Sequence, residues 1–240
     1  MNRRFIRYTQ SGQIFIVPGD DPGRIVDVMV DTGYDDEFCY ALNFDPAFIA
    51  ALMEAGFLVM SVPIKPSRGP DGRLYRYLLL PKLHLERSVL FWEDLRETKT
   101  ARRLLKRYEL RYDADFDRIV KRCVDVHGAD WLTPPLQESI RAIRAFKSGP
   151  VRPVSFALYR DGNLVAGEFG VVTGRVYTSY SGYRDEDSAG TVQLVMTGRY
   201  LKDAGFAFWD LGMPLDYKDR LGARNVGPGL FVELFRNACR

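Results

Sequence analysis

The stretch LYRDGNLVAGEFGVVTGRVYTSYSGYRDEDSAGTVQLVMTGRYLKDAGFAFWDLGMPLDYKDRLGA, residues 158–223, carries most of the information about the fold. Two apolar, β-prone runs, residues 154–158 and 164–172, flank the turn Asp161-Gly162-Asn163, which is typical of a hairpin. A second turn at Thr173-Gly174 leads to a predicted strand over residues 176–181. The sequence therefore predicts three consecutive antiparallel strands.

A polar loop, a helix and a last strand are predicted to follow. The loop covers residues 181–188, and the helix is indicated by apolar residues near helical spacing from Val192 to Leu201, with Gly205 placed to end it. Residues 206–211 then read as a buried strand. An antiparallel meander that feeds a helix and a strand is similar to the acyl-donor core of the acetyltransferase superfamily.

The segment before this core divides into two parts. Residues 1–80 predict a small α/β domain with a strand at 13–17, a possible strand at 25–30, a helix over 45–56 and a hairpin of 57–64 with 74–80. Asp45-Pro46 suits the start of that helix, with Asp as the N-cap. Residues 81–240 are predicted to form the second domain.

The first part of this second domain, residues 81–149, is expected to be mostly helical. Phe116, Ile119, Val120 and Cys123 recur at the spacing of a core-facing helical stripe, so the thiol of Cys123 is expected to be packing. Thr133-Pro134 is expected to begin another helix, which runs through residue 146 with its apolar side over 140–146. The fold class predicted for the whole chain is mixed α+β.

Length and composition limit the class of protein. The chain has 240 residues and 46% hydrophobic residues, enough for packed cores, and no apolar run approaches the ~20 residues that cross a bilayer. The basic start of the chain lacks the apolar region of a secretory signal. Three distant cysteines favour neither a disulfide framework nor a zinc site. We expect a soluble, cytoplasmic protein without membrane contact and without a metal.

Positive charge is concentrated after residue 98, although the net charge of the chain is only +3. If residues 100–108 are helical, Arg102 with Lys106 and Arg103 with Arg107 lie one turn apart, which aligns their charges, and Lys99 precedes them. Such a stripe can neutralise phosphates, whereas the alternative is a solvated helix face.

Short motifs along the chain carry a closer resemblance than the fold does. They are Arg87-Ser88-Val89-Leu90, the basic segment 99–103, Trp131-Leu132-Thr133, Leu164-Val165-Ala166-Gly167, Phe169-Gly170-Val171, Gly174-Arg175-Val176-Tyr177, Asp210 and Arg220-Leu221-Gly222-Ala223. In this order they resemble the bacterial leucyl/phenylalanyl-tRNA–protein transferases. The resemblance covers about residues 37–237 and indicates a diverged member of that family.

The resemblance implies a reaction and a site. The free α-amine of an acceptor protein attacks the ester of an aminoacyl-tRNA, which marks protein N-termini in the N-degron pathway. Asp210 falls at the family's acid position, and Tyr180 and Ser181 fall in the catalytic loop. Arg87, Trp131 and the basic residues Lys99, Arg102, Arg103, Lys106 and Arg107 are expected to bind aminoacyl-tRNA. No cofactor beyond the aminoacyl-tRNA co-substrate is implied, and we expect a monomer.

Two positions depart from the family pattern. Tyr180 stands where the family has a catalytic glutamate, and Gly212 stands where it has a glutamine. Tyr180 can donate a hydrogen bond but cannot act as a general base at neutral pH without a large pKa shift, and Gly212 offers only backbone groups. Glu168, or one of the acids over residues 185–187, could supply a displaced carboxylate, and the sequence does not choose among them. The polar loop also suggests a pocket for a basic or polar aminoacyl group.

Two other functions compete with aminoacyl transfer. A coenzyme-A-dependent N-acetyltransferase could use the same core, but it would need a glycine-rich pyrophosphate loop where residues 183–190 are acidic. A catalytically weak tRNA-binding relative would explain the departures at Tyr180 and Gly212 while keeping the basic segment.

Overall fold

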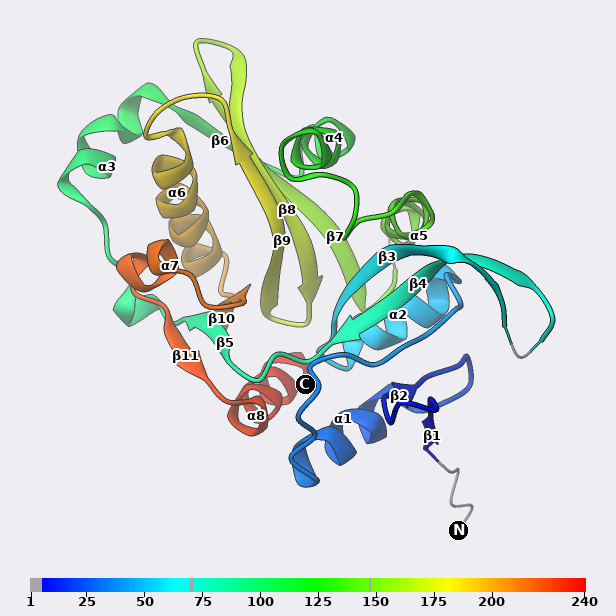
Figure 1. The fold of residues 1–240 in the computed structure, drawn as a ribbon. Helices are drawn as coiled ribbons and strands as arrows, with labels where there is room; N and C mark the ends of the chain where they lie inside the picture. The colour runs from blue at the N-terminus through cyan, green and yellow to red at the C-terminus, as the bar shows by residue number, and fades with distance from the viewer. Residues whose placement is uncertain (1–5, 70, 147) are drawn as a thin grey trace. The chain divides into compact units, whose positions relative to one another are not determined.

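The computed structural model describes residues 6–69, 71–146 and 148–240 (Figure 1). Their contacts form two compact units: unit 1 contains Met1–Leu85 and Gly128–Pro150, and unit 2 contains Glu86–His127 and Val151–Arg240. Division of the chain at residue 80 stays a prediction. In the structure, the segment Gly128–Pro150 groups with the N-terminal part.

The described residues of unit 2 form a seven-stranded sheet in the order β11-β5-β10-β9-β8-β7-β6. The strands are β5 (Arg87–Leu90), β6 (Glu109–Tyr112), β7 (Val151–Arg160), β8 (Asn163–Thr173), β9 (Val176–Arg184), β10 (Phe208–Gly212) and β11 (Arg224–Val226). Among the neighbouring pairs, β9 with β10 is parallel and the others are antiparallel. The predicted mixed, mostly antiparallel sheet is confirmed.

Turn chemistry explains the hairpin between β7 and β8. Strands β7 and β8 are joined at Asp161 and Gly162, whose φ angles are 51° and 78°. Positive φ at both central residues is the geometry that matches the twist of a two-residue hairpin, and an Asp-Gly pair adopts it at low cost. The predicted turn is therefore confirmed.

Two long helices pack on opposite faces of this sheet. The helix α6 (Ala189–Asp203) packs Val195 and Leu201 with Phe156, Tyr177 and Trp209 of the strands. On the other face, α4 (Phe116–His127) brings Phe116 within a ring-centroid distance of 6.0 Å of Phe169. Figure 1 shows β7, β8 and β9 running between these helices. Alternating side chains of one strand thus serve two cores.

Shorter elements complete unit 2. They are α3 (Lys99–Leu104), α7 (Asp216–Leu221), α8 (Pro228–Cys239) and two 3₁₀ turns, Trp92–Asp94 and Leu105–Arg107. The predicted helix over residues 100–108 is too long, because the α-helix ends at Leu104 and tightens into the second 3₁₀ turn. Leu104 and Leu105 pack there against a buried cluster, and short 3₁₀ turns are frequent at the ends of α-helices.

Unit 1 contains two β-ribbons and three helices within its described residues. Its elements are β1 (Arg7–Tyr8), β2 (Ile14–Phe15), α1 (Pro22–Asp31), α2 (Pro46–Glu54), β3 (Leu58–Arg68), β4 (Leu74–Lys82) and α5 (Pro134–Ala145). The side chain of Asp45 caps α2 by accepting from the N–H groups of Ala47 and Phe48 at 2.9 and 3.2 Å. The N-cap assigned from Asp45-Pro46 and the long hairpin are confirmed.

One predicted strand is wrong: residues 25–30 lie in the helix α1. The carboxylate of Asp21 accepts hydrogen bonds from the N–H groups of Gly23 and Arg24, and Pro22 occupies the first turn. Ile25, Val26 and Met29 then share one buried face. The N-cap signal outweighs the β-propensity of the β-branched residues.

The middle segment, residues 81–149, is rich in helix as predicted, and it also contributes β5 and β6 to the sheet, which was not predicted. Two further expectations are corrected. The predicted polar loop starts later, because β9 continues to Arg184 with Tyr183 buried opposite β8. Phe146 does not share the apolar side of α5; it is 67% exposed beyond the end of the helix.

Candidate functional site

The sheet of unit 2 splits between β9 and β10, and a cavity lies at the split. Strand β10 pairs with β9 only through Phe208, Trp209 and Asp210 against Val176, Tyr177 and Thr178. Residues 179–184 of β9 have no paired strand on that side among the described residues. A cavity of about 480 Å³ lies along this free edge, lined from β8, β9, α4, α6 and α7. Its volume falls in the usual range for small-molecule sites.

Glu168 of β8 is the acidic residue among the described residues that line this cavity. It is 4% exposed, and one carboxylate oxygen, Oε2, accepts from the hydroxyl of Ser179 at 3.2 Å. The other oxygen, Oε1, is buried without a hydrogen-bond partner among the described residues. Burial raises the pKa of Glu168 to about 7, and the Ser179 hydroxyl offsets only part of that rise.

The groups around Glu168 are held by one another. The indole N–H of Trp209 donates to the hydroxyl of Ser179 at 2.8 Å, and Gln193 donates to Thr197 at 2.9 Å. Lys218 of α7 is 5% exposed and donates to the carbonyl oxygens of Leu211 and Met213, both at 2.6 Å. Burial lowers the pKa of Lys218 to about 8. The carboxylate thus lies in a hydrogen-bonded, largely desolvated wall of the cavity.

Asp210, predicted as the catalytic acid, is buried in an ion pair instead of lining the cavity. Its two oxygens accept from Nε and a terminal nitrogen of Arg87 at 2.9 and 2.6 Å. Thr178 and the backbone N–H of Gly212 also donate to it, at 2.8 and 3.0 Å. Arg87 is 1% exposed, and its guanidinium stacks 4.0 Å from the ring centroid of Phe231.

Arg87 therefore connects β5 to β10 through Asp210 and contacts α8 through Phe231. A buried bidentate pair fixes strand geometry, and removal of one partner leaves an uncompensated charge. Direct contact of Arg87 with a tRNA phosphate has no support from this position, and a catalytic role for Asp210 stays a prediction.

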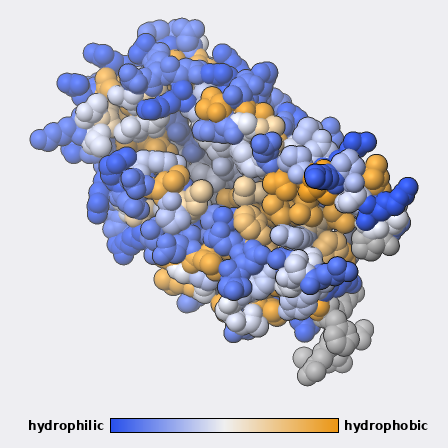
Figure 2. All heavy atoms as spheres, in the orientation of Figure 1, coloured by the Kyte–Doolittle hydropathy of each residue, from blue (hydrophilic) through white to orange (hydrophobic). Residues whose placement is uncertain are grey.

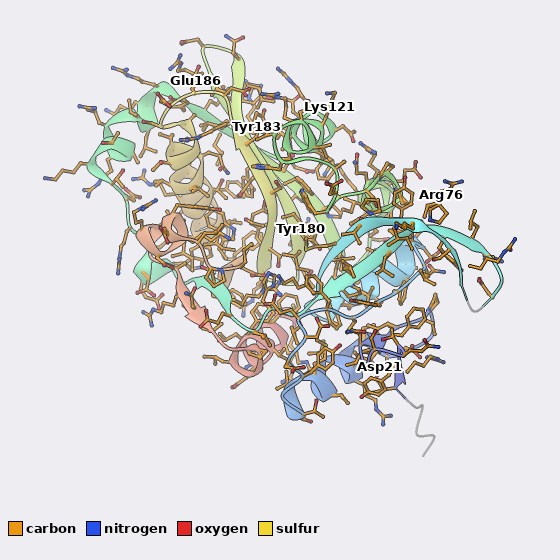
Figure 3. The ribbon with its side chains drawn as sticks, viewed as in Figure 1. Asp21, Arg76, Lys121, Tyr180, Tyr183 and Glu186 are labelled. Carbon is orange, nitrogen blue, oxygen red and sulfur yellow. The ribbon has the colours of Figure 1, made fainter. Side chains whose placement is uncertain are left out.

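Tyr180 lies at a β-bulge. Phe169 pairs with Ser181 and Gly170 pairs with Ser179, so Tyr180 is the extra residue on β9. Figure 3 labels Tyr180 and Tyr183 along this strand and Glu186 beyond its end. Bulges commonly re-aim side chains beside active sites. Ser181 follows the bulge, and the aromatic ring of Tyr180 lies 6.0 Å from that of Phe169. Neither residue lines the cavity.

The predicted RNA-binding residues are partly brought together. Lys99, Arg102, Arg103, Lys106 and Arg107 are all exposed on α3 and the following turn, and Figure 2 shows hydrophilic residues over that region of the surface. Trp131 is half-buried in unit 1, where its carbonyl oxygen accepts from the N–H of Ser61 at 3.0 Å. Their contact with tRNA stays a prediction.

Two other features, membrane-spanning helices and metal-binding clusters, are absent from the described residues. Within them, no helix is long and apolar enough to cross a membrane, and no three His, Cys, Asp or Glu side chains could together hold a metal ion. Cys123 is buried as predicted, and burial raises the pKa of its thiol to about 12. His127 ends α4 and lines the cavity, with Nε2 2.8 Å from the carbonyl oxygen of Gly182.

Comparison with known proteins matches residues 89–236, which include the cavity and most of the sheet, to the model of the leucyl/phenylalanyl-tRNA protein transferases. The chain belongs to this family. The resemblance inferred from the short motifs is thus confirmed.

Relatives in this family are distant. The leucyl/phenylalanyl-tRNA–protein transferase of Pseudomonas paraeruginosa is 30% identical over 154 residues, which cover 61% of this chain and 66% of the relative. That of Pseudomonas putida KT2440 is 27% identical over 207 residues, or 80% of this chain and 89% of the relative. The first matches thus span slightly less than two thirds of the relatives' length. Among solved structures, FemX is 9% identical with a TM-score of 0.47 over 95% of this chain and 80% of the other. A GCN5-related N-acetyltransferase from Kribbella flavida is 14% identical with a TM-score of 0.35 over 89% and 77%.

The sequence indicated Glu168 only as one of several possible acids, and it gave no indication that Lys218 is buried near the cavity. The available signal was the isolation of Glu168 in the apolar run of β8, where each neighbouring residue is buried. A carboxylate in such a strand must be paired, protonated or functional. Lys218 gave no comparable signal, because its burial depends on the packing of α7.

Proposed function

We propose that this chain transfers an aminoacyl group from an aminoacyl-tRNA to the N-terminal α-amine of an acceptor protein, in the cytoplasm and as part of an N-degron pathway. The observation that carries the proposal is the family match over residues 89–236, which contain the elements that line the cavity at the split sheet. The cavity is where the aminoacyl ester is expected to bind.

The reaction needs little from the protein because the ester is already activated. The amine nitrogen forms a bond to the carbonyl carbon, the carbon–oxygen ester bond breaks, and the tRNA 3′ oxygen leaves with a proton. Positioning and stabilisation of the intermediate oxyanion supply most of the acceleration in such reactions.

The free edge of β9 provides a hydrogen-bond donor for that oxyanion. The carbonyl oxygen of Gly182 points to the edge, where His127 contacts it. The N–H and C=O groups of one residue point to the same side of an antiparallel strand, so the N–H of Gly182 faces the cavity as well. A developing negative charge on the ester oxygen would be stabilised there.

The exposed cations of α3 and the following turn are the proposed contact for the tRNA. Five positive side chains, Lys99, Arg102, Arg103, Lys106 and Arg107, project from this segment, and all five are exposed. Phosphate contacts of this kind make affinity fall steeply as salt rises. Binding through the backbone of the tRNA would leave the aminoacyl end to be read by the cavity.

The test is a transfer assay with the set of radiolabelled aminoacyl-tRNAs and a peptide with a free N-terminus. Transfer of at least one aminoacyl group is expected, with none to the same peptide acetylated at its N-terminus. Tight tRNA binding without transfer from any donor would overturn the proposal in favour of a binding relative. Acetylation of the peptide from acetyl-CoA would overturn it in favour of an acetyltransferase.

A further inference from the structure

Glu168 presents an unusual group to a cavity that has to hold an aminoacyl side chain. It comes from a strand whose neighbouring residues are buried, and it is itself 4% exposed. Its Oε1 has no hydrogen-bond partner among the described residues, whereas Oε2 accepts from Ser179. An unmade hydrogen bond on a buried carboxylate is costly, and a bound donor would remove that cost.

We propose that Glu168 selects a cationic aminoacyl side chain, arginyl or lysyl, by pairing with it inside the cavity. This inference rests on the proposed aminoacyl transfer and names its substrate class. A leucyl or phenylalanyl side chain in the same place would cover the carboxylate with apolar surface and leave Oε1 unpaired. An ammonium or guanidinium group would donate to Oε1 and balance its charge.

The rest of the wall suits a long cationic side chain. Tyr183 and Tyr217 line the cavity and offer aromatic surface to an aliphatic stem or to the cation itself. The buried cation close to Glu168, Lys218, directs its hydrogen bonds to the carbonyl oxygens of Leu211 and Met213. It therefore leaves Oε1 available to a substrate.

The experiment measures kcat/KM for arginyl-, lysyl-, leucyl- and phenylalanyl-tRNA with the wild-type chain, Glu168→Gln and Glu168→Leu. The wild type is expected to prefer the cationic donors. Because charge-assisted hydrogen bonds are the stronger ones, Glu168→Gln should lower kcat/KM for arginyl and lysyl transfer roughly 10- to 100-fold with little effect on the apolar donors. Glu168→Leu should invert the preference.

A matched control is Asp203→Asn, which removes an exposed carboxylate at the end of α6, a helix that also lines the cavity. It should leave the ratio of cationic to apolar transfer unchanged. Thermal unfolding of each variant shows whether it is folded, and gain of leucyl transfer by Glu168→Leu cannot come from misfolding.

The possible failures are distinct. Equal loss of transfer from all four donors in Glu168→Gln would make Glu168 a general base for the acceptor amine and overturn its role in selection. Leucyl or phenylalanyl transfer by the wild type as fast as arginyl transfer would overturn the inference while leaving aminoacyl transfer intact. Absence of transfer from every aminoacyl-tRNA would overturn the proposed function itself.

Discussion

Replacement of Glu168 by glutamine should change how the stability of the protein depends on pH. Glutamine keeps the shape of the side chain and can still accept from Ser179, but it has no charge to bury. In the wild type, burial raises the pKa of Glu168 from 4.5 to about 7. The folded state therefore holds a proton on this group over a range of pH in which the unfolded chain has lost it.

The sign follows from the raised pKa of Glu168. The free energy of unfolding of the wild type should fall as pH rises from about 4.5 to about 7, because the unfolded state binds fewer protons there. Each step of one in pKa is worth about 1.4 kcal/mol, so the full effect is about 3 kcal/mol. Glu168→Gln should lack this dependence and gain stability relative to the wild type by about that amount near pH 7.5.

Urea denaturation of both proteins at several pH values between about 4.5 and 7.5 measures the difference. Among the groups that Glu168 influences, Lys218 titrates nearest to this range, and its pKa should fall further in Glu168→Gln because the charge of Glu168 supports the charged lysine. Asp203→Asn serves as the control for loss of an exposed carboxylate and should follow the wild type. A difference between Glu168→Gln and the wild type that stays constant with pH would refute a raised pKa for this group.

Three further substitutions test the fold and the proposed tRNA contact. Asp210→Ala should destabilise the protein by about 3–5 kcal/mol in urea denaturation because it leaves Arg87 buried without its partner, and a loss below about 1 kcal/mol would contradict that. Asp45→Ala removes the N-cap of α2 and should cost about 1 kcal/mol, with thermal unfolding as the measurement and no change as the contrary result. Arg103→Glu should weaken tRNA binding and reduce its salt dependence, whereas Lys121→Glu, an exposed control on α4, should not; equal effects of the two would argue against a specific contact through α3.

Local signals predicted the elements whose stability is local. The hairpin at Asp161-Gly162 and the cap at Asp45 each depend on residues within a few positions, so the sequence contains the information. Asp21-Pro22 carries the same cap signal, yet the β-branched residues after it suggested a strand. The structure shows that the cap and the buried face of Ile25 and Met29 determine the result.

Long-range pairing could not be predicted in the same way. Strand β5 is only four residues long, and it lies between β10 and β11, which follow it by more than 100 residues in the chain. Its place is fixed by the ion pair of Arg87 with Asp210 and by backbone pairing to both neighbours. The sequence predicted that Arg87 binds aminoacyl-tRNA, but its side chain is 1% exposed and pairs with Asp210.

The bulge at Tyr180 explains why the acid of this site could not be chosen from the sequence. One extra residue on β9 shifts its register, so Gly182, and no larger side chain, stands opposite Glu168. A Cβ atom at Gly182 would come within 3.2 Å of the Cβ of Glu168, so glycine there keeps space beside the carboxylate. Tyr180, where the resemblance placed a glutamate, and the carboxylate of Glu168 therefore lie on the adjacent strands β9 and β8. From the sequence alone, Tyr180 suggests that the catalytic acid is missing. The sheet register instead places a different acid, Glu168, at the wall of the cavity, and the groups around it determine its charge.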